Sequence, residues 1–324
     1  MRPAGGAPTS AGGPPAAATC RPAVREEVLP ALGFVLGSAS EPADDVHVND
    51  FLRFARRRGI DASAVWLADA GGSLAWAVLP VLSPGRTMLL LGPVGGPTHP
   101  TVFQIAGQLV DAVCERYGAH DVQLAQVLLD PGDAVSRRLY EGRAFARVAE
   151  LIYLQAAPRR KAPAPALPPG LRWVGYSADT HALFGRAILG TYDRSLDCPS
   201  LNGLRGIEDV LAGHKASGEF DPRLWGALCE GERPLGVLLL ARAAPGETME
   251  LVYLGLAPDA RGRGLGDVMM REALAITAAD GGGRLSLAVD SNNAPALRLY
   301  YRHGMQRVGA KLAMMRRLDP APGA

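Results

Sequence analysis

Cysteine, net charge and long apolar runs are all scarce in this sequence of 324 residues. Only four cysteines occur and none forms a C-x-x-C pair, so their spacing predicts neither a zinc site nor a disulfide framework. The 34 basic and 32 acidic residues nearly cancel, which excludes a general electrostatic attraction to nucleic acid or to an anionic membrane. No apolar run approaches the ~20 residues that span a bilayer, and the first residues lack a signal-peptide pattern, so we expect a cytoplasmic location.

Alanine, glycine and proline are abundant instead, and they mark the divisions of the chain. Residues 1–23 are dominated by these three types and cannot bury enough apolar surface to offset the entropy of ordering, so we expect a disordered tail. Residues 158–170 are rich in proline and alanine, which predicts a semi-rigid linker. These divisions leave one domain at 24–157 and another at 171–318, followed by a tail at 319–324.

The two predicted domains share an internal repeat. Pro-Gly-Arg-Thr-Met at 84–88 recurs as Pro-Gly-Glu-Thr-Met at 245–249, 161 residues later, and Leu-Tyr at 139–140 recurs at 299–300, 160 residues later. A gap of one residue reconciles the two spacings and preserves the order of the matches. We therefore predict two copies of one fold.

Apolar periodicity in the second copy predicts the order of its elements. The predicted helices cover 182–192, 207–216, 265–280 and 294–303, and the predicted strands cover 224–229, 235–241, 248–256, 284–290 and 307–317. This order predicts an α/β fold, in which each tandem domain is a mixed, mostly antiparallel sheet flanked by helices.

The connection between the strand at 248–256 and the helix at 265–280 is rich in glycine and arginine. Glycines allow close approach of the main chain to a ligand, and the free amides at the helix start carry the positive end of the helix dipole. Such a loop can hold a pyrophosphate, and Arg261 and Arg263 add positive charge. A helix cap without a ligand is the alternative. A dinucleotide-binding fold is disfavoured, because the spacing is G-x-G-x-G rather than G-x-G-x-x-G.

A second motif follows at residues 293–304, where Asn293 suits a helix N-cap and Tyr300 lies on the same helical face. The two motifs, R-x-x-G-x-G at 261–266 and N-x-x-A-x-x-L-Y-x-x-x-G at 293–304, resemble the GNAT superfamily of acetyl-CoA-dependent N-acetyltransferases over residues 235–318. The tandem layout is similar to that of mycothiol synthase-like members, although no motif points to their substrate.

The resemblance implies acetyl-CoA as a co-substrate and no metal. In this family the loop amides bind the pyrophosphate, and the pantetheine arm pairs with the preceding strand like an added strand. A main-chain N–H near Leu256 stabilises the oxyanion, and Asn293 bonds the pantetheine arm. The cofactor-binding residues implied in this way are Leu254, Leu256, Arg261, Gly262, Arg263, Gly264, Leu265, Gly266 and Asn293.

The same resemblance implies two catalytic residues. Tyr300 is placed to protonate the departing thiolate. Glu250 matches the catalytic glutamate of histone-acetylating members, and an exposed strand carboxylate without a catalytic role is the alternative. Because side chains alternate along a strand, Tyr253 lies on the opposite face from Glu250 unless a bulge intervenes.

The polar segment at 192–222 corresponds to the acceptor loop of this family. Tyr192, Asp193, Asp197 and Glu219 are candidates to bind a cationic amine, and helix caps in a solvated loop are the alternative. Cys198 is disfavoured as an acyl-carrying nucleophile, because no base is close to it in the sequence. We expect a small-molecule or peptide amine as the acceptor, and neither nucleic acid nor membrane as a partner.

The first copy departs from the motifs. Residues 96–106 lack the paired glycines and include prolines that remove amide donors, so we expect a degenerate domain that supports the second copy. The sequence thus predicts an N-acetyltransferase whose second domain transfers an acetyl group to an amine by direct attack in a ternary complex. A non-catalytic acyl-CoA-binding module and transfer to another nucleophile are the alternatives.

Overall fold

The computed structural model describes residues 18–38, 40–158, 165–243, 248–281 and 283–318. Most of the predicted N-terminal tail, all of the predicted C-terminal tail and part of the predicted linker lie outside these residues. Where the N-terminal tail is described, the prediction of disorder is wrong: β1 (Thr19–Pro22) pairs antiparallel with β2 (Trp66–Ala70). Cys20 packs against the core of this half, so contacts distant in sequence order a segment whose own composition does not.

The N-terminal half contains six strands and four α-helices among its described residues. After β1 and β2, its strands are β3 (Ser73–Ser83), β4 (Thr87–Leu91), β5 (Leu124–Leu129) and β6 (Ala146–Ala156). Its helices are α1 (Val28–Leu36), α2 (Asp45–Arg58), α3 (Pro100–Gly118) and α4 (Ala134–Glu141).

The C-terminal half follows the predicted order of elements, with an added first strand. Its strands are β7 (Leu171–Gly175), β8 (Trp225–Glu230), β9 (Arg233–Ala243), β10 (Thr248–Leu256), β11 (Arg284–Asp290) and β12 (Gln306–Arg317). Its helices are α5 (His181–Tyr192), α6 (Ile207–Ala216), α7 (Leu265–Ala279) and α8 (Ala294–Arg302). Strands β4 and β10 begin 161 residues apart, and β5 and β11 begin 160 apart, which confirms the repeat.

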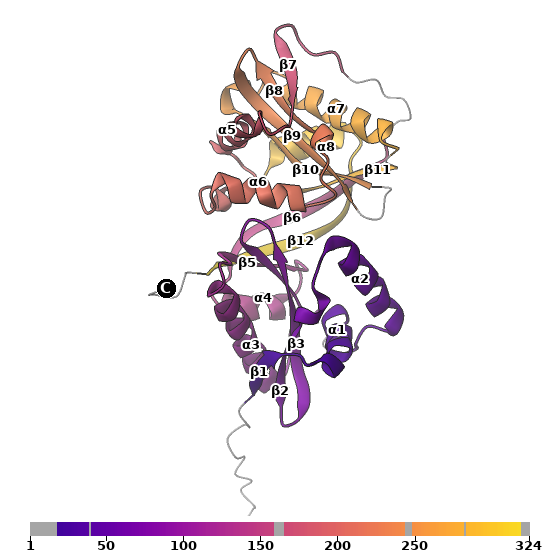
Figure 1. Ribbon diagram of the computed structural model, residues 1–324, viewed down its shortest axis with the longest axis vertical. Helices are drawn as coiled ribbons and strands as arrows, with labels where there is room; N and C mark the ends of the chain where they lie inside the picture. The colour runs from indigo at the N-terminus through magenta and orange to yellow at the C-terminus, as the bar shows by residue number, and fades with distance from the viewer. Residues whose placement is uncertain (1–17, 39, 159–164, 244–247, 282, 319–324) are drawn as a thin grey trace, which may run out of the picture.

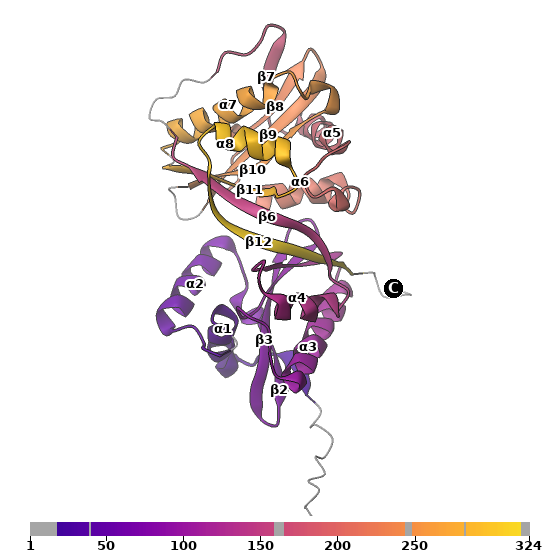
Figure 2. The same ribbon diagram turned by 180° about the vertical axis from the view of Figure 1, so that it is seen from behind.

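The two halves exchange their last strands. One sheet of twelve strands runs in the order β1-β2-β3-β4-β5-β12-β6-β11-β10-β9-β8-β7. Strand β12 therefore lies between β5 and β6 of the N-terminal half, while β6 pairs with β11 of the C-terminal half. Both figures show β6 and β12 crossing together between the halves (Figure 1, Figure 2). The predicted boundary near residue 157 thus separates two copies in sequence that share strands in space.

Helices cover both faces of the sheet in each half. Helices α1 and α2 lie on one side of β3, with α3 and α4 on the other, and α7 and α8 lie on the opposite face from α5 and α6 (Figure 2). Buried apolar side chains fill the space between these layers as separate cores for the two halves. No helix in the described part of the chain is both long and apolar enough to cross a membrane.

Each half opens where its two parallel strands part. Strand β10 pairs with β11 only from Thr248 to Glu250, and β4 pairs with β5 only from Thr87 to Leu89. In the C-terminal half, β10 continues beside β9 to Leu256, with a bulge between Leu251 and Tyr253. The opening between β10 and β11 is the position of the candidate site.

Candidate active site

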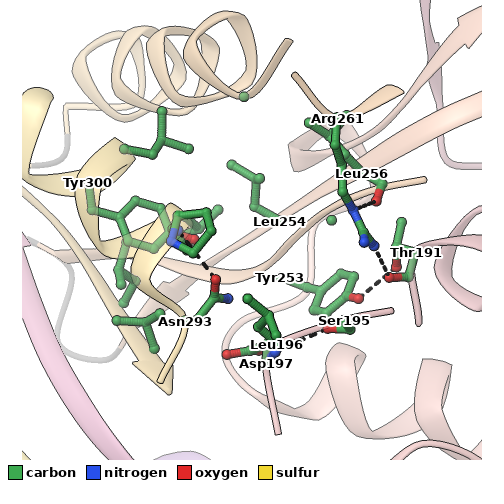
Figure 3. A pocket seen from close by; sticks show the side chains of 18 of the residues that line it. Thr191, Ser195, Leu196, Asp197, Tyr253, Leu254, Leu256, Arg261, Asn293 and Tyr300 are labelled. Carbon is green, nitrogen blue, oxygen red and sulfur yellow. Dashed lines mark hydrogen bonds between the residues drawn. The ribbon is translucent and has the colours of Figure 1, made fainter. Parts of the chain in front are cut away.

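A cavity of about 510 Å³ occupies the opening between β10 and β11. Its walls come from the two strands, from the start of α7, from α8 and from the loop that follows α5 (Figure 3). This volume lies within the range of ~300–1,000 Å³ that is usual for small-ligand sites. Below, this space is called the acetyl cavity, because the motifs around it predict the binding of acetyl-CoA.

The edge of β10 presents free main-chain groups to the acetyl cavity. Beyond Glu250, no described segment of the chain pairs with this edge on the β11 side. On its other side, the Ala257 N–H donates to the Leu235 carbonyl at 2.8 Å. Because successive amides of a strand point in opposite directions, the Leu256 N–H points toward the cavity. A free strand edge and an inward-pointing amide near Leu256 thus lie where the sequence motif predicts contacts with a pantetheine arm and a thioester carbonyl.

Two glycines shape the start of α7. Gly262 and Gly264 have φ angles of 75° and 76°, in the left-handed region that other residues rarely adopt, and Gly264 is the N-cap of α7. The side chain of Leu265 is buried, and a Cβ atom at Gly266 would lie 3.2 Å from Leu299 of α8. The loop thus leaves the first amides of α7 without side chains over them, and these amides fit a pyrophosphate group.

The Arg261 side chain has a different function from the predicted one. Its guanidinium donates hydrogen bonds to four main-chain carbonyls, those of Leu256, Thr191, Asp193 and Arg194, at 2.8 to 3.0 Å. Its hydrogen-bonding capacity is therefore directed into the protein rather than toward a phosphate. Arg261 fastens the end of α5 to the end of β10, and these bonds use four of the five N–H groups of its side chain.

Replacing Arg261 with glutamine should loosen the wall of the acetyl cavity that follows α5. Because the glutamine amide cannot replace four donated hydrogen bonds, we expect faster proteolysis of the segment after Tyr192 and a loss of about 1–3 kcal/mol of stability. Limited proteolysis and thermal unfolding measure both effects. Arg263 pairs with exposed Glu230 at 2.8 Å, so Arg263→Gln is the matched control and should change stability by less than 1 kcal/mol.

Helix α8 brings Asn293 and Tyr300 to the cavity. The Asn293 side chain caps the helix by accepting a hydrogen bond from the Ala296 N–H at 3.3 Å, and it lines the cavity beside Tyr300 (Figure 3). Burial raises the pKa of Tyr300 well above its usual value, and Asp197 adds to the effect. Tyr300 therefore stays protonated near neutral pH and can donate a proton into the cavity.

Asp197 is the predicted acceptor carboxylate that the structure brings to the cavity. It follows α5, and its Oδ1 accepts a hydrogen bond from the Asp290 N–H at 3.2 Å. Burial raises the pKa of Asp197, and this hydrogen bond opposes the shift. Cys198, its neighbour, has its pKa raised to about 12 by burial, so the thiol stays protonated and is a poor nucleophile.

Glu250 does not line the acetyl cavity. It lies in the paired part of β10, opposite Ala241 of β9, and burial raises its pKa. Tyr253 lies opposite Leu239, two residues from Ala241, so the bulge puts Tyr253 and Glu250 on the same face of the sheet. The bulge thus overrides the simple alternation of side chains, which would have put the two residues on opposite faces.

The other three predicted acceptor residues lie around the site rather than in it. Tyr192 is half-buried, and its ring lies edge-on to Tyr253 at 6.4 Å. The Asp193 side chain is exposed beside Arg194, and exposed Glu219 forms a main-chain bridge with Arg242. The structure therefore does not bring the last two carboxylates to the cavity.

Sequence reasoning did not single out Thr191 and Asp290. The Thr191 hydroxyl donates to the Ile188 carbonyl at 2.6 Å and bonds the Tyr253 hydroxyl at 2.7 Å. Buried Asp290 accepts a hydrogen bond from the Cys198 N–H at 3.2 Å, which holds the loop after α5 against β11. A lone threonine at the end of a helix carries no sequence signal. Asp290 could have been singled out, because it lies at the end of a predicted strand, just before the Asn293 motif.

The corresponding opening in the N-terminal half is small. Its cavity measures about 110 Å³ and is lined by buried Tyr140 and by Lys311, which pairs with Asp130 at 2.7 Å. The Tyr140 hydroxyl lies 3.6 Å from the Cβ position of Gly92, so the tyrosine fills the space between β4 and β5. The opening in the N-terminal half is thus much smaller than the acetyl cavity.

Comparison with known proteins identifies the family that the C-terminal half matches and the fold of the chain. Residues 194–305 match the family model described as Acetyltransferase (GNAT) family. The C-terminal half of the chain is therefore a GNAT domain, as its motifs predicted.

Over 94% of this chain and 96% of the other, the fold is similar to that of a GCN5-related N-acetyltransferase from Sphaerobacter thermophilus, with a TM-score of 0.60 and 18% identity. A tandem GNAT protein from the clavulanic acid biosynthesis pathway aligns over 94% and 100% of the chains, with a TM-score of 0.53 and 14% identity. The tandem GNAT fold is thereby confirmed.

Among curated proteins, the chain is similar to two mycothiol acetyltransferases. The one from Clavibacter michiganensis subsp. michiganensis is 32% identical over 124 residues, which is 35% of this chain and 39% of that protein. The one from Beutenbergia cavernae is 36% identical over 90 residues, 28% of this chain and 30% of that protein. The matched segments thus span less than two-fifths of these relatives.

Proposed function

We propose that the C-terminal half transfers an acetyl group from acetyl-CoA to an amine. The observation that carries this proposal is the cavity between β10 and β11, which joins a free strand edge to the glycine-lined start of α7. The match of residues 194–305 to the GNAT family supports acetyl-CoA as the co-substrate. The similarity to mycothiol acetyltransferases supports a small molecule as the acceptor.

In this proposal the chain supplies one hydrogen-bond donor, one acid and one base. The Leu256 N–H holds the thioester carbonyl oxygen, where negative charge develops as the amine attacks the carbonyl carbon. As the C–S bond breaks, the Tyr300 hydroxyl gives its proton to the sulfur. The proton that leaves the amine nitrogen goes to a carboxylate, and the Tyr300 phenolate then recovers a proton from that carboxyl group or from solvent, which returns both residues to their starting states. No metal takes part in these steps.

Two carboxylates are candidates for the base. Asp197 lines the acetyl cavity, whereas Glu250 lies outside its lining and shares a face of the sheet with Tyr253. A base must come within hydrogen-bond reach of the proton, directly or through one water molecule. We propose Asp197 as the base that accepts this proton, and Glu250, which would reach it only through a water molecule, as the alternative base.

The isosteric variants Asp197→Asn and Glu250→Gln separate these two candidates. We expect kcat/KM to fall about 100-fold in the first and less than tenfold in the second, since removal of a general base costs ~10²–10⁴. Because burial raises the pKa of Asp197, activity should decline with falling pH at a higher pH than for an ordinary aspartate, and Asp197→Asn should lack this limb. A larger loss in Glu250→Gln would assign the base to Glu250.

The function itself is tested by coenzyme A release over a panel of amines, including the acceptor of mycothiol acetyltransferase. Calorimetric titration with acetyl-CoA measures binding in parallel. Binding together with release on one amine supports the transferase. Binding without release on any amine supports the alternative, an acyl-CoA-binding module, while release only with hydroxyl or thiol compounds assigns another nucleophile.

A further inference from the structure

A separate cavity of about 230 Å³ lies where the two halves of the chain meet. Ser83 and Thr87 line it from the N-terminal half, and Arg205, His214 and Ser217 line it from the C-terminal half. It shares no lining residue with the acetyl cavity. Among the described residues, its lining includes hydroxyl, imidazole and guanidinium groups but no carboxylate. Below, this space is called the junction cavity.

The walls of the junction cavity are fixed by contacts between the halves. Gly85, with a φ of 84°, passes so close to the Asp209 carbonyl that a side chain there would collide with it. Arg86 donates to the Asp209 carboxylate at 2.7 Å, and Arg58 donates to the Ser217 carbonyl at 3.2 Å. The negative charge of Asp209 is therefore already compensated by Arg86.

Arg205 is half-buried in the wall of the junction cavity and makes no hydrogen bond or ion pair within the described ranges. By contrast, Arg86 and Arg58 beside it are both bonded. Burying a cation without a counter-charge is costly, so partly buried arginines are normally paired. An anionic group in the cavity would supply the missing partner.

His214 supplies a second unpaired donor. Its Nε2 atom is buried and has no hydrogen-bond partner among the residues that the structure describes. Burial lowers the pKa of His214 to about 4, and Arg205 contributes to this shift, so the imidazole is neutral at pH 7. A neutral imidazole protonated on Nε2 donates one hydrogen bond. Because His214 also lines the junction cavity, a turn of its ring would bring this donor to an acceptor oxygen there.

We propose that the junction cavity binds a small molecule through an oxyanion, a carboxylate or a phosphate, held by the Arg205 guanidinium and the His214 Nε2–H. A planar guanidinium matches both anions with paired hydrogen bonds. The ring of His214 lies 5.3 Å from that of Tyr253, which lines the acetyl cavity. The imidazole is thus part of the wall between the two cavities, and the anion binds a site distinct from that of acetyl-CoA.

Calorimetry on the full-length protein tests this site with inorganic phosphate and, separately, with succinate. Coenzyme A is present at saturation, so that the loop at the start of α7 is not available to either anion. We expect one of the two to bind, which identifies the anion class, and Arg205→Gln to weaken it about tenfold or more. Arg205→Lys should bind with intermediate affinity, and His214→Phe should weaken binding several-fold.

Arg57→Gln is the matched control, because Arg57 is exposed and unbonded in the described part of the chain, and it should bind like wild type. Circular dichroism and coenzyme A binding confirm that each variant is folded. If Arg205→Gln does not fold, the anion affinities of Arg205→Lys and His214→Phe, compared with that of wild type, test the proposal instead. Equal affinity in wild type and the cavity variants, or no binding of either anion to wild type, overturns the proposal. Coenzyme A binding is measured in the same samples. If it is unchanged, a negative result for the anion concerns the junction cavity alone and leaves the proposed function of the acetyl cavity intact.

Discussion

A chain that ends at Met305 should lose the cooperative folding of both halves, although only the C-terminal half is shortened. The missing strand, β12, pairs with β5 and β6, so its removal exposes two strand edges of the N-terminal half. Burial of Leu312 and Met314 alone contributes about 3–6 kcal/mol. Domains are typically stable by ~5–15 kcal/mol, so the loss removes much or all of this stability. Thermal unfolding followed by near-UV circular dichroism measures the effect.

A chain that ends at Leu318 is the control, since it keeps β12 and the hydrogen bond from the Leu318 N–H to the Gln123 carbonyl at 2.8 Å. We expect it to unfold like the full chain. A normal unfolding transition of the N-terminal half in the shorter chain would show that β12 is dispensable there.

Replacing Gly264 with valine should raise the dissociation constant of coenzyme A at least tenfold. The φ angle of 76° strains any β-branched residue at this position, and the helix start would either shift or carry a side chain over its free amides. No atom lies within 4 Å of the Cβ position, so the strain, of about 1–2 kcal/mol, is local and the protein should stay folded. Calorimetric titration measures the affinity.

Gly281→Val is a matched control at the other end of α7. Gly281 has a φ of 78° and also has no atom within 4 Å of its Cβ position, so it carries the same backbone strain away from the acetyl cavity. This variant should lose similar stability and keep the affinity of wild type. Equal affinity in both variants would mean that the loop at 261–266 does not contact the cofactor.

Local patterns were sufficient to predict most elements of the second copy. Strand β10 and helix α6 begin and end where the apolar runs predicted, because glycines, polar turns and caps limit these elements within a few residues. The exchange of β6 and β12 was not predicted. It depends on pairing between segments about 160 residues apart, and each strand would satisfy the same pattern in either half.

The site was predictable where a motif constrains the main chain and less so where only side-chain type was available. The left-handed Gly264 and the N-cap Asn293 lie where their motifs require them. Arg261, in contrast, was expected to face a phosphate and bonds four carbonyls. Three of these lie at or just after the end of α5, about 70 residues earlier, and a sequence motif does not show contacts over that distance. The sequence does not show which way a carboxylate in a polar loop points. Of the candidate acceptor carboxylates, only Asp197 lines the cavity.

The shared strands also bear on how the first copy could change over evolutionary time. Strand β6 belongs to the degenerate half by sequence, yet it forms the support on which β11 rests beside the acetyl cavity. Mutations that unfold the N-terminal half would therefore also disturb β11 and the acetyl cavity beside it, whereas changes confined to its loops would leave that support in place. Purifying selection on the ancestral duplicate would then act on its architecture alone, and the pair would be inherited as one inseparable unit.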